Sequence, residues 1–356
     1  MHPLLPLIPI AAIAAIAKHK LSGEKLSKYD VPHDITFDVD PNSPAIIAMN
    51  AYLTENFIIP AQSGTPQSRL KDKRAFFDQG GLARDFDCEH RPDLIRTKTH
   101  AIPGEWTLVD GAEPGRRILY LHGGGYTVGS AISHRAITYN LAKRTKAAVF
   151  APDYRLMPEH SRQDIIDDAQ AAYDWIIENG PHGPRKVQRL AIGGDSAGAN
   201  LTLALLPWVR DTKRRAANAV FTFSAPVDST FQSPSIRSNF ETDLMLQPLV
   251  APALKIPRSA LLWLSWKKLG LSPAHPLLSP IMADLHKLPP TLLQVSTHEM
   301  LFDDSVRYAQ KASRAGSPVT LQSWSHVPHV FQIFDDMLPE AIDALDEVAA
   351  FLKGKL

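Results

Sequence analysis

The sequence has 356 residues, and 38 lysines and arginines nearly balance 37 aspartates and glutamates, which leaves a formal net charge of +1. This balance provides no electrostatic basis for binding nucleic acid, so a neutral small molecule is the expected ligand. Cys88 is the only cysteine, which excludes an internal disulfide and a thiolate metal cluster, and the histidines show no metal-site spacing. We expect no cofactor, and a cytoplasmic location that suits the absence of disulfides.

The N-terminal segment, residues 1–17, is apolar apart from His2 and is followed by a basic patch. It is shorter than the ~20 apolar residues that span a bilayer, and three prolines disfavour a helix in its first half. It also lacks the basic start of a secretory signal. Two interpretations fit it: an interfacial membrane anchor with a helix at residues 10–17, or part of a helical cap.

Between residues 46 and 121, the positions of proline and glycine and the alternation of apolar residues predict short helices and then strands. Residues 46–77 carry a mixed pattern broken by proline and glycine, which predicts only short helices. Residues 93–102 and 106–109 alternate like two strands separated by Pro103-Gly104. Residues 116–121 form an apolar run that predicts a buried strand.

A glycine run, His122-Gly123-Gly124-Gly125, follows that strand directly. Glycines let the backbone approach a bound carbonyl, so that main-chain N–H groups can donate to it as part of an oxyanion hole. The alternatives are a flexible turn or a phosphate-binding loop, although neither G-x-x-x-x-G-K-[ST] nor G-x-G-x-x-G occurs here. We expect His122 to hold the loop in shape rather than to transfer protons.

Further along the chain, predicted strands alternate with predicted helices. Helical patterns at residues 136–145 and 165–176 flank an apolar strand at 147–151, and another strand is predicted at 219–224. Such alternation is typical of right-handed crossovers and a mostly parallel sheet covered on both faces.

The sequence Gly194-Asp195-Ser196-Ala197-Gly198 lies between the helix predicted at 165–176 and the strand predicted at 219–224, at a strand-to-helix junction. This spacing is typical of a nucleophile elbow, because the turn is too tight for side chains at the two glycine positions. Ser196 is then the candidate nucleophile, and the Ala197 N–H points at a developing oxyanion. A small-residue turn before a helix is the alternative.

The His122 to Gly125 run, the stretch at residues 153–160 and the Gly194 to Gly198 elbow together resemble the hormone-sensitive-lipase-like branch of the α/β-hydrolase family. The resemblance runs from about residue 97 to the C-terminus. It implies an α/β-hydrolase fold with a mostly parallel eight-stranded sheet, flanking helices and a helical cap. It also implies oxyanion donors at Gly123, Gly124 and Ala197. We further expect Tyr126, which follows the glycine run, and Asp195, inside the elbow motif, to bind the substrate.

We expect one domain, residues 1–356, because no linker interrupts the chain. Its core comprises about 93–230 and 277–356, and its cap about 1–75 and 231–276. Residues 231–276 leave the strand–helix rhythm and are too apolar for a simple connection, as in the cap of the family that the chain resembles.

Three carboxylates follow the strand predicted at residues 291–295, where the acid of a catalytic triad belongs. Asp304 is expected at the start of a helix, where its charge favours the helix dipole. The acid-x-Leu-x-Asp pattern of the family maps onto Glu299 to Asp303 and implies Glu299 as the acid. Most members have aspartate there, so Asp303 is kept as the alternative.

Two histidines follow the last predicted strand, residues 319–324. The family's catalytic histidine is followed by any residue and then an aromatic, which fits His329-Val330-Phe331. We therefore predict His329 as the general base and His326 as a partly exposed loop residue.

The predicted function is hydrolysis of short- to medium-chain carboxylic esters of an apolar alcohol, through Ser196, His329, Glu299 and an acyl-enzyme. Two alternatives stay open: acyl transfer or lactone formation on the same triad, and a non-hydrolytic ligand-binding receptor. The expected partner is the ester substrate. Contact of residues 1–17 with a membrane surface and a homodimer are further expectations.

Overall fold

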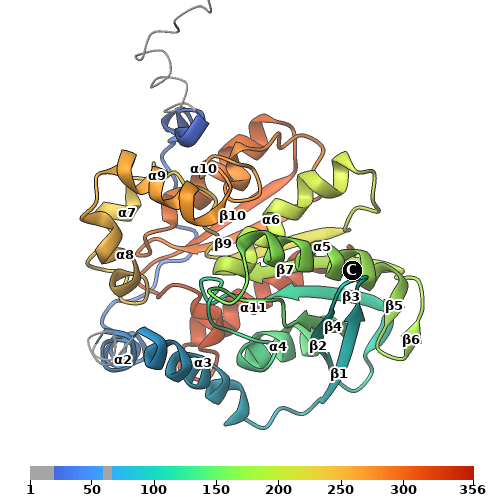
Figure 1. Ribbon diagram of the computed structural model, residues 1–356. Coiled ribbons are helices and arrows are strands. Elements are labelled where there is room, and N and C mark those ends of the chain that lie inside the picture. Colours follow the sequence, from blue (N-terminus) through green and yellow to red (C-terminus); the bar gives the residue numbers. More distant parts are fainter. Residues whose placement is uncertain (1–19, 59–65) are drawn as a thin grey trace, which may run out of the picture.

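The computed structural model describes residues 20–58 and 66–356, and at the centre of this part lies an eight-stranded sheet (Figure 1). Its strand order is β1-β2-β4-β3-β7-β8-β9-β10, and only β2 runs opposite to the other strands. This confirms the predicted mostly parallel sheet. The bounds are β1 (Glu89–Arg96), β2 (Ala101–Leu108), β3 (Glu113–Leu121), β4 (Ala147–Pro152), β7 (Arg189–Asp195), β8 (Ala219–Phe223), β9 (Thr291–Ser296) and β10 (Val319–Trp324).

Helices cover both faces of the sheet (Figure 1). Helices α4 (Arg135–Thr145) and α11 (Pro339–Leu352) bury apolar side chains against one face. On the other face, α5 (Arg162–Glu178), α6 (Ser196–Asp211) and α10 (Phe302–Arg314) share a second apolar cluster. The central strands are buried on both sides, which explains their continuous apolar sequences.

The first hairpin differs from the sequence-based prediction. The turn lies at residues 97–100, where Thr97 Oγ1 and Thr97 N both donate to the His100 carbonyl, and Pro103-Gly104 lie inside β2. Phe150 of the neighbouring strand packs where a Gly104 side chain would point. Gly104 therefore serves close packing between strands, and the threonine and histidine make the turn.

The N-terminal part contains more helix than the pattern predicted. After a short 3₁₀ turn η1 (Leu26–Tyr29), it consists of α2 (Pro44–Leu53), η2 (Thr54–Ile58) and the 17-residue α3 (Pro66–Leu82). Polar side chains of α3 fix it to the core, because Arg74 donates to the carbonyls of Thr127 and Met157. Apolar periodicity therefore could not reveal this helix. Residues 1–17, interpreted from sequence as an anchor or as cap, lie outside the described residues.

Between β8 and β9 the chain leaves the strand–helix rhythm, as predicted. This segment contains α7 (Ser235–Ser238), α8 (Gln247–Leu254) and α9 (Arg258–Leu269). Within the described ranges, no helix combines the length and apolar character needed to cross a membrane. The remaining short elements are β5 (Asn179–Gly180), β6 (Gly183–Pro184), η4 (Ile132–His134), η5 (Pro280–Met282) and η6 (Phe331–Ile333).

Candidate active site

Four loops meet at the carboxyl edge of the parallel strands. They follow β3, β7, β9 and β10 and carry the glycine run, Ser196, Glu299 and His329. Loops at this edge of an α/β sheet converge because neighbouring parallel strands end side by side. The sheet therefore brings together residues that lie far apart in the sequence.

Ser196 occupies a sharp turn between β7 and α6. Its backbone φ is +47°, in the left-handed region that a non-glycine residue rarely adopts. Gly198 allows this turn, because a Cβ there would lie 1.9 Å from the Leu121 carbonyl oxygen and 2.4 Å from that of His122. The strained serine and the close helix–strand approach are those of a nucleophile elbow.

A continuous chain of hydrogen bonds joins Ser196, His329 and Glu299. The distance from Ser196 Oγ to His329 Nε2 is 2.9 Å, and the distance from His329 Nδ1 to Glu299 Oε2 is also 2.9 Å. Both His329 and Glu299 are buried. Of the two acids weighed from sequence, the structure brings Glu299 to the histidine.

The surroundings of His329 favour its protonated form. Burial by itself lowers the pKa of His329, but the hydrogen bond to Glu299 and the charges of Glu299 and Asp243 outweigh it, and the pKa rises above its ordinary value. Burial raises the pKa of Glu299, and His329 offsets part of that rise. Asp243 was not found from sequence, because nothing in the segment after β8 marks it as a neighbour of the histidine.

In the glycine run, the structure differs from the prediction for one oxyanion donor, Gly123. Gly123 was expected to donate to an oxyanion, but its N–H donates to Asp195 Oδ1 at 2.9 Å and lies 3.2 Å from His134 Nε2. The Tyr120 hydroxyl donates to the same Asp195 oxygen at 2.7 Å. The Gly123 N–H is therefore occupied by protein acceptors.

The same hydrogen-bond network also corrects the role predicted for Asp195. It was expected to bind the substrate, yet its carboxylate is buried and faces the Gly123 N–H, Tyr120 and His134. Burial by itself raises the pKa of Asp195, but the neighbouring His134 and Tyr120 outweigh it and lower the pKa below its ordinary value. Asp195 therefore ties the glycine run to the elbow.

The next two glycines have free donors. Gly124 has φ +107° and Gly125 has φ +59°, and neither N–H donates to an acceptor among the described residues. A Cβ at Gly124 would lie 2.1 Å from the Val128 carbonyl oxygen, so this turn requires glycine. Gly125 was not predicted as a donor.

Two polar contacts from α3 brace the loop that contains this turn. Arg74 donates to the Thr127 carbonyl at 2.8 Å, and Asp78 Oδ1 accepts from the Ser130 hydroxyl at 2.6 Å. His122 is buried, and its ring stacks on Tyr154 at 4.2 Å between centroids. Burial lowers the pKa of His122 to about 3, which agrees with the expected structural role.

Tyr126, expected at the substrate, is partly exposed and has a buried cation behind its ring. The guanidinium carbon of Arg162 lies 3.7 Å from the ring centroid. Arg162 also donates to Asn200 Oδ1 at 2.7 Å, one helical turn after Ser196. These contacts support the Tyr126 ring beside the elbow.

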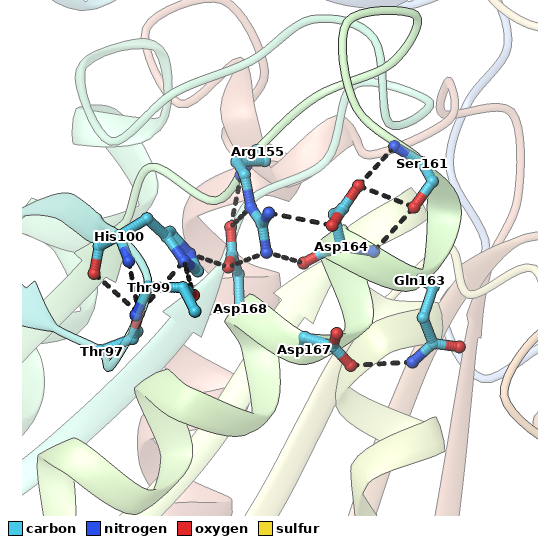
Figure 2. A network of polar contacts seen from close by, with 9 residues as sticks. All are labelled: Thr97, Thr99, His100, Arg155, Ser161, Gln163, Asp164, Asp167 and Asp168. Atoms are coloured by element: carbon cyan, nitrogen blue, oxygen red, sulfur yellow. Dashed lines mark hydrogen bonds and ion pairs between the residues drawn. The ribbon is translucent and has the colours of Figure 1, made fainter.

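The motif at residues 153–160 is held by an ion-pair network and is not part of the hydrogen-bonded chain of Ser196, His329 and Glu299. Figure 2 shows Arg155 between Asp164 and Asp168 of α5. Arg155 donates through its backbone and side chain to Asp168, which also accepts from His100 Nε2 at 2.7 Å. The network joins the first hairpin, the motif and α5.

The remaining candidates lie outside the hydrogen-bonded chain. Asp303 accepts the Ser235 N–H at 2.7 Å, and Asp304 accepts those of Val227 and Asp228 at 2.8 and 3.0 Å. Both lie in the first turn of α10, where Asp304 was expected, and their carboxylates fix the segment after β8. His326 is partly buried and its ring contacts His298.

Ser296, the last residue of β9, joins two loops of the site through its hydroxyl. Its hydroxyl donates to the Val327 carbonyl at 2.5 Å and accepts the His298 N–H at 3.1 Å. The serine thereby joins the end of β9, which leads to Glu299, to the loop that carries His329. It fixes the two loops relative to each other.

A strand-to-helix elbow, a buried Ser–His–Glu hydrogen-bonded chain and free backbone donors lie together on an eight-stranded, mostly parallel sheet, which is the arrangement of the α/β-hydrolase fold. Residues 118–333 match the α/β hydrolase fold family. The chain is 36% identical to an acetyl-hydrolase of Streptomyces hygroscopicus over 242 residues, which cover 68% of this chain and 76% of that protein.

Two other similarities extend over more of the chain. An ethyl acetate hydrolase of Pseudomonas putida is 29% identical over 284 residues, covering 78% of this chain and 86% of that protein. The crystal structure of an esterase from the bacterial hormone-sensitive lipase family has a TM-score of 0.74 and 30% identity, covering 88% of this chain and 99% of that one. The chain belongs to the hormone-sensitive-lipase-like esterases of the α/β hydrolase fold family and is a carboxylic ester hydrolase.

Proposed function

We propose that the protein is a serine carboxylesterase that cleaves short- to medium-chain esters through Ser196, His329 and Glu299. The observation that carries this proposal is the unbroken hydrogen-bonded chain from the serine hydroxyl to the buried carboxylate. A serine hydroxyl is a weak nucleophile until a base removes its proton, and His329 Nε2 lies within hydrogen-bonding distance.

In the acylation step, His329 takes the Ser196 proton as Oγ attacks the ester carbonyl. Glu299 accepts from His329 Nδ1, which keeps Nε2 free as the base and stabilises the imidazolium cation that forms. His329 then donates the proton to the leaving alcohol, and the acyl group stays on Ser196. Water, activated by His329, attacks this acyl-enzyme and releases the acid.

The oxyanion donors that we propose are the N–H groups of Gly124, Gly125 and Ala197. Gly123 is left out because its N–H already donates to Asp195. Ala197 lies at the N-terminal end of α6, where the helix dipole adds to the attraction for negative charge. Losing one such donor typically costs about 3 kcal/mol of transition-state stabilisation.

We propose the substrate class from the apolar sequence of residues 231–276 and from the names of similar proteins. We propose that α2, α3 and α7 to α9 form the cap, with an apolar 231–276 part that favours an apolar alcohol. The names acetyl-hydrolase and ethyl acetate hydrolase among the relatives favour a short acyl group.

A series of p-nitrophenyl esters from acetate to palmitate tests this proposal. We expect kcat/KM to be highest between acetate and octanoate and to fall about tenfold or more at palmitate, because the acyl pocket that we propose is too short for the long chain. Activity restricted to palmitate would contradict the proposed acyl length. An absence of activity throughout the series would contradict the esterase mechanism.

Asp243 provides a pH-dependent prediction. Its charge raises the pKa of His329, so removing the charge in Asp243→Asn lowers that pKa. Only neutral His329 accepts the serine proton, and activity falls as pH drops through this pKa. We therefore expect the acid limb of kcat/KM in Asp243→Asn to move to lower pH than in the wild type.

The matched control is Glu241→Gln, which removes an exposed carboxylate two positions away that contacts Gln247. Its acid limb is expected at the wild-type position. Asp243 also accepts the N–H groups of Leu246 and Met300, so thermal unfolding of each variant is measured in parallel. If the acid limb of kcat/KM in Asp243→Asn stays at the wild-type pH or moves to higher pH, the charge of Asp243 does not raise the pKa of His329.

A further inference from the structure

Helix α9 exposes its most apolar residues instead of burying them. Trp263, Leu264 and Trp266 are 49%, 45% and 41% exposed, and Leu262 is the only buried residue of the helix. Leu249 of α8 is 59% exposed. Figure 1 places α8 and α9 at the periphery of the molecule, away from the central sheet. Several large apolar side chains exposed on one helix, with another on the helix before it, are typical of an interaction surface.

The segment that carries α8 and α9 is basic in sequence, and the exposed carboxylate of Glu241, just before it, accepts from Gln247 of α8. Residues 244–283 contain no aspartate or glutamate, and they contain Lys255, Arg258, Lys267 and Lys268. The three lysines are exposed, and none forms an ion pair within the part of the chain that the structure describes. The Lys267 ammonium lies 5.9 and 5.6 Å from the ring centroids of Trp263 and Trp266.

The combination of tryptophan and lysine indicates the chemistry of the partner. Tryptophan rings favour the headgroup level of a bilayer, where one edge is apolar and the other hydrated. Lysines beside them are attracted to anionic headgroups. A protein partner of neutral charge would leave the three unpaired lysines uncompensated, whereas an anionic lipid surface matches both the charge and the apolar side chains.

The start of the described chain lies next to this face. The Ser272 hydroxyl, just after α9, donates to the Lys20 carbonyl at 2.5 Å, and Gly23 packs against Met282. The sequence before Lys20 is apolar through residue 17 and then basic.

We propose that the outer face of α9, with Leu249 of α8, docks the protein on an anionic lipid bilayer. Trp263, Leu264 and Trp266 enter the interface, and Lys267 and Lys268 contact the headgroups. Helix α9 has 12 residues, too few for the ~20 that span a bilayer, so it lies in the plane of the surface.

The test is sedimentation of the full-length protein with unilamellar vesicles of phosphatidylcholine, alone or mixed with phosphatidylglycerol. We expect binding to the anionic vesicles and about tenfold or more weaker binding to phosphatidylcholine alone. Trp263→Ser/Trp266→Ser and Lys267→Glu/Lys268→Glu should each weaken binding to anionic vesicles about tenfold or more. Brominated lipids should quench the tryptophan fluorescence of the wild type.

The matched control is Ile47→Ser/Leu82→Ser, which removes two apolar side chains of α2 and α3 that are 57% and 61% exposed. It should bind as the wild type does, and unchanged melting temperatures show that all variants fold. Wild-type binding in both α9 variants would assign the docking to another part of the chain and overturn the proposal. An absence of vesicle binding would also overturn it, as would a dimer in sedimentation velocity that the tryptophan variant abolishes.

Discussion

Glu299→Gln is expected to lower kcat for p-nitrophenyl acetate by roughly 10³ to 10⁴ while the protein stays folded. The Glu299 carboxylate accepts from His329 Nδ1, which leaves Nε2 as the acceptor for the Ser196 hydroxyl. A glutamine can present its amide N–H to Nδ1, which favours the tautomer with the proton on Nε2. That tautomer cannot take the serine proton, and no charge is left to stabilise the imidazolium.

Asp303→Asn is the matched comparison, because it also exchanges a carboxylate for an amide at nearly constant volume. Asp303 accepts the Ser235 N–H and makes no contact with His329, so we expect kcat near that of the wild type. The lost charge costs about 1 kcal/mol of folding stability, measured by denaturant unfolding. If Asp303→Asn abolishes activity and Glu299→Gln retains it, the triad must be redrawn with Asp303.

Ser196→Ala is expected to lower kcat by about 10⁶, because no other hydroxyl can form the acyl-enzyme with His329. The backbone donors and the binding pocket remain, so a small rate above that in water persists. The control is Ser238→Ala, an exposed serine on α7, which should hydrolyse p-nitrophenyl acetate at the wild-type rate. Equal activity in the two variants would contradict the assignment of the nucleophile.

The order of elements could be predicted because buried strands carry continuous apolar runs and each motif follows one of them. Once parallel strands are expected, Ser196, Glu299 and His329 must meet at the same sheet edge. The structure brings these three side chains together as expected, with Glu299 rather than Asp303 at the histidine. Their catalytic roles stay predictions that the substitutions above test.

Contacts between distant segments could not be read from the pattern. The Gly123 donor was misassigned because the Asp195 carboxylate, 72 positions away, occupies its N–H. Asp243 lies near His329 only because the segment after β8 returns to the loop after β9, where Asp243 accepts the Met300 N–H. Helix α3 is held by polar side chains that carry no apolar period. A motif predicts which backbone turn forms, but the partners of its donors depend on tertiary packing.

The central claim is that Ser196 is an activated nucleophile, and labelling with a fluorophosphonate probe tests it most directly. The phosphorus atom is attacked only by a serine whose proton a base removes, so the label reports the Ser196–His329 pair and not substrate choice. We expect one covalent adduct per chain, located on Ser196 by mass spectrometry and absent in Ser196→Ala. A folded wild-type protein that stays unlabelled, or that carries its adduct on another residue, would contradict the account.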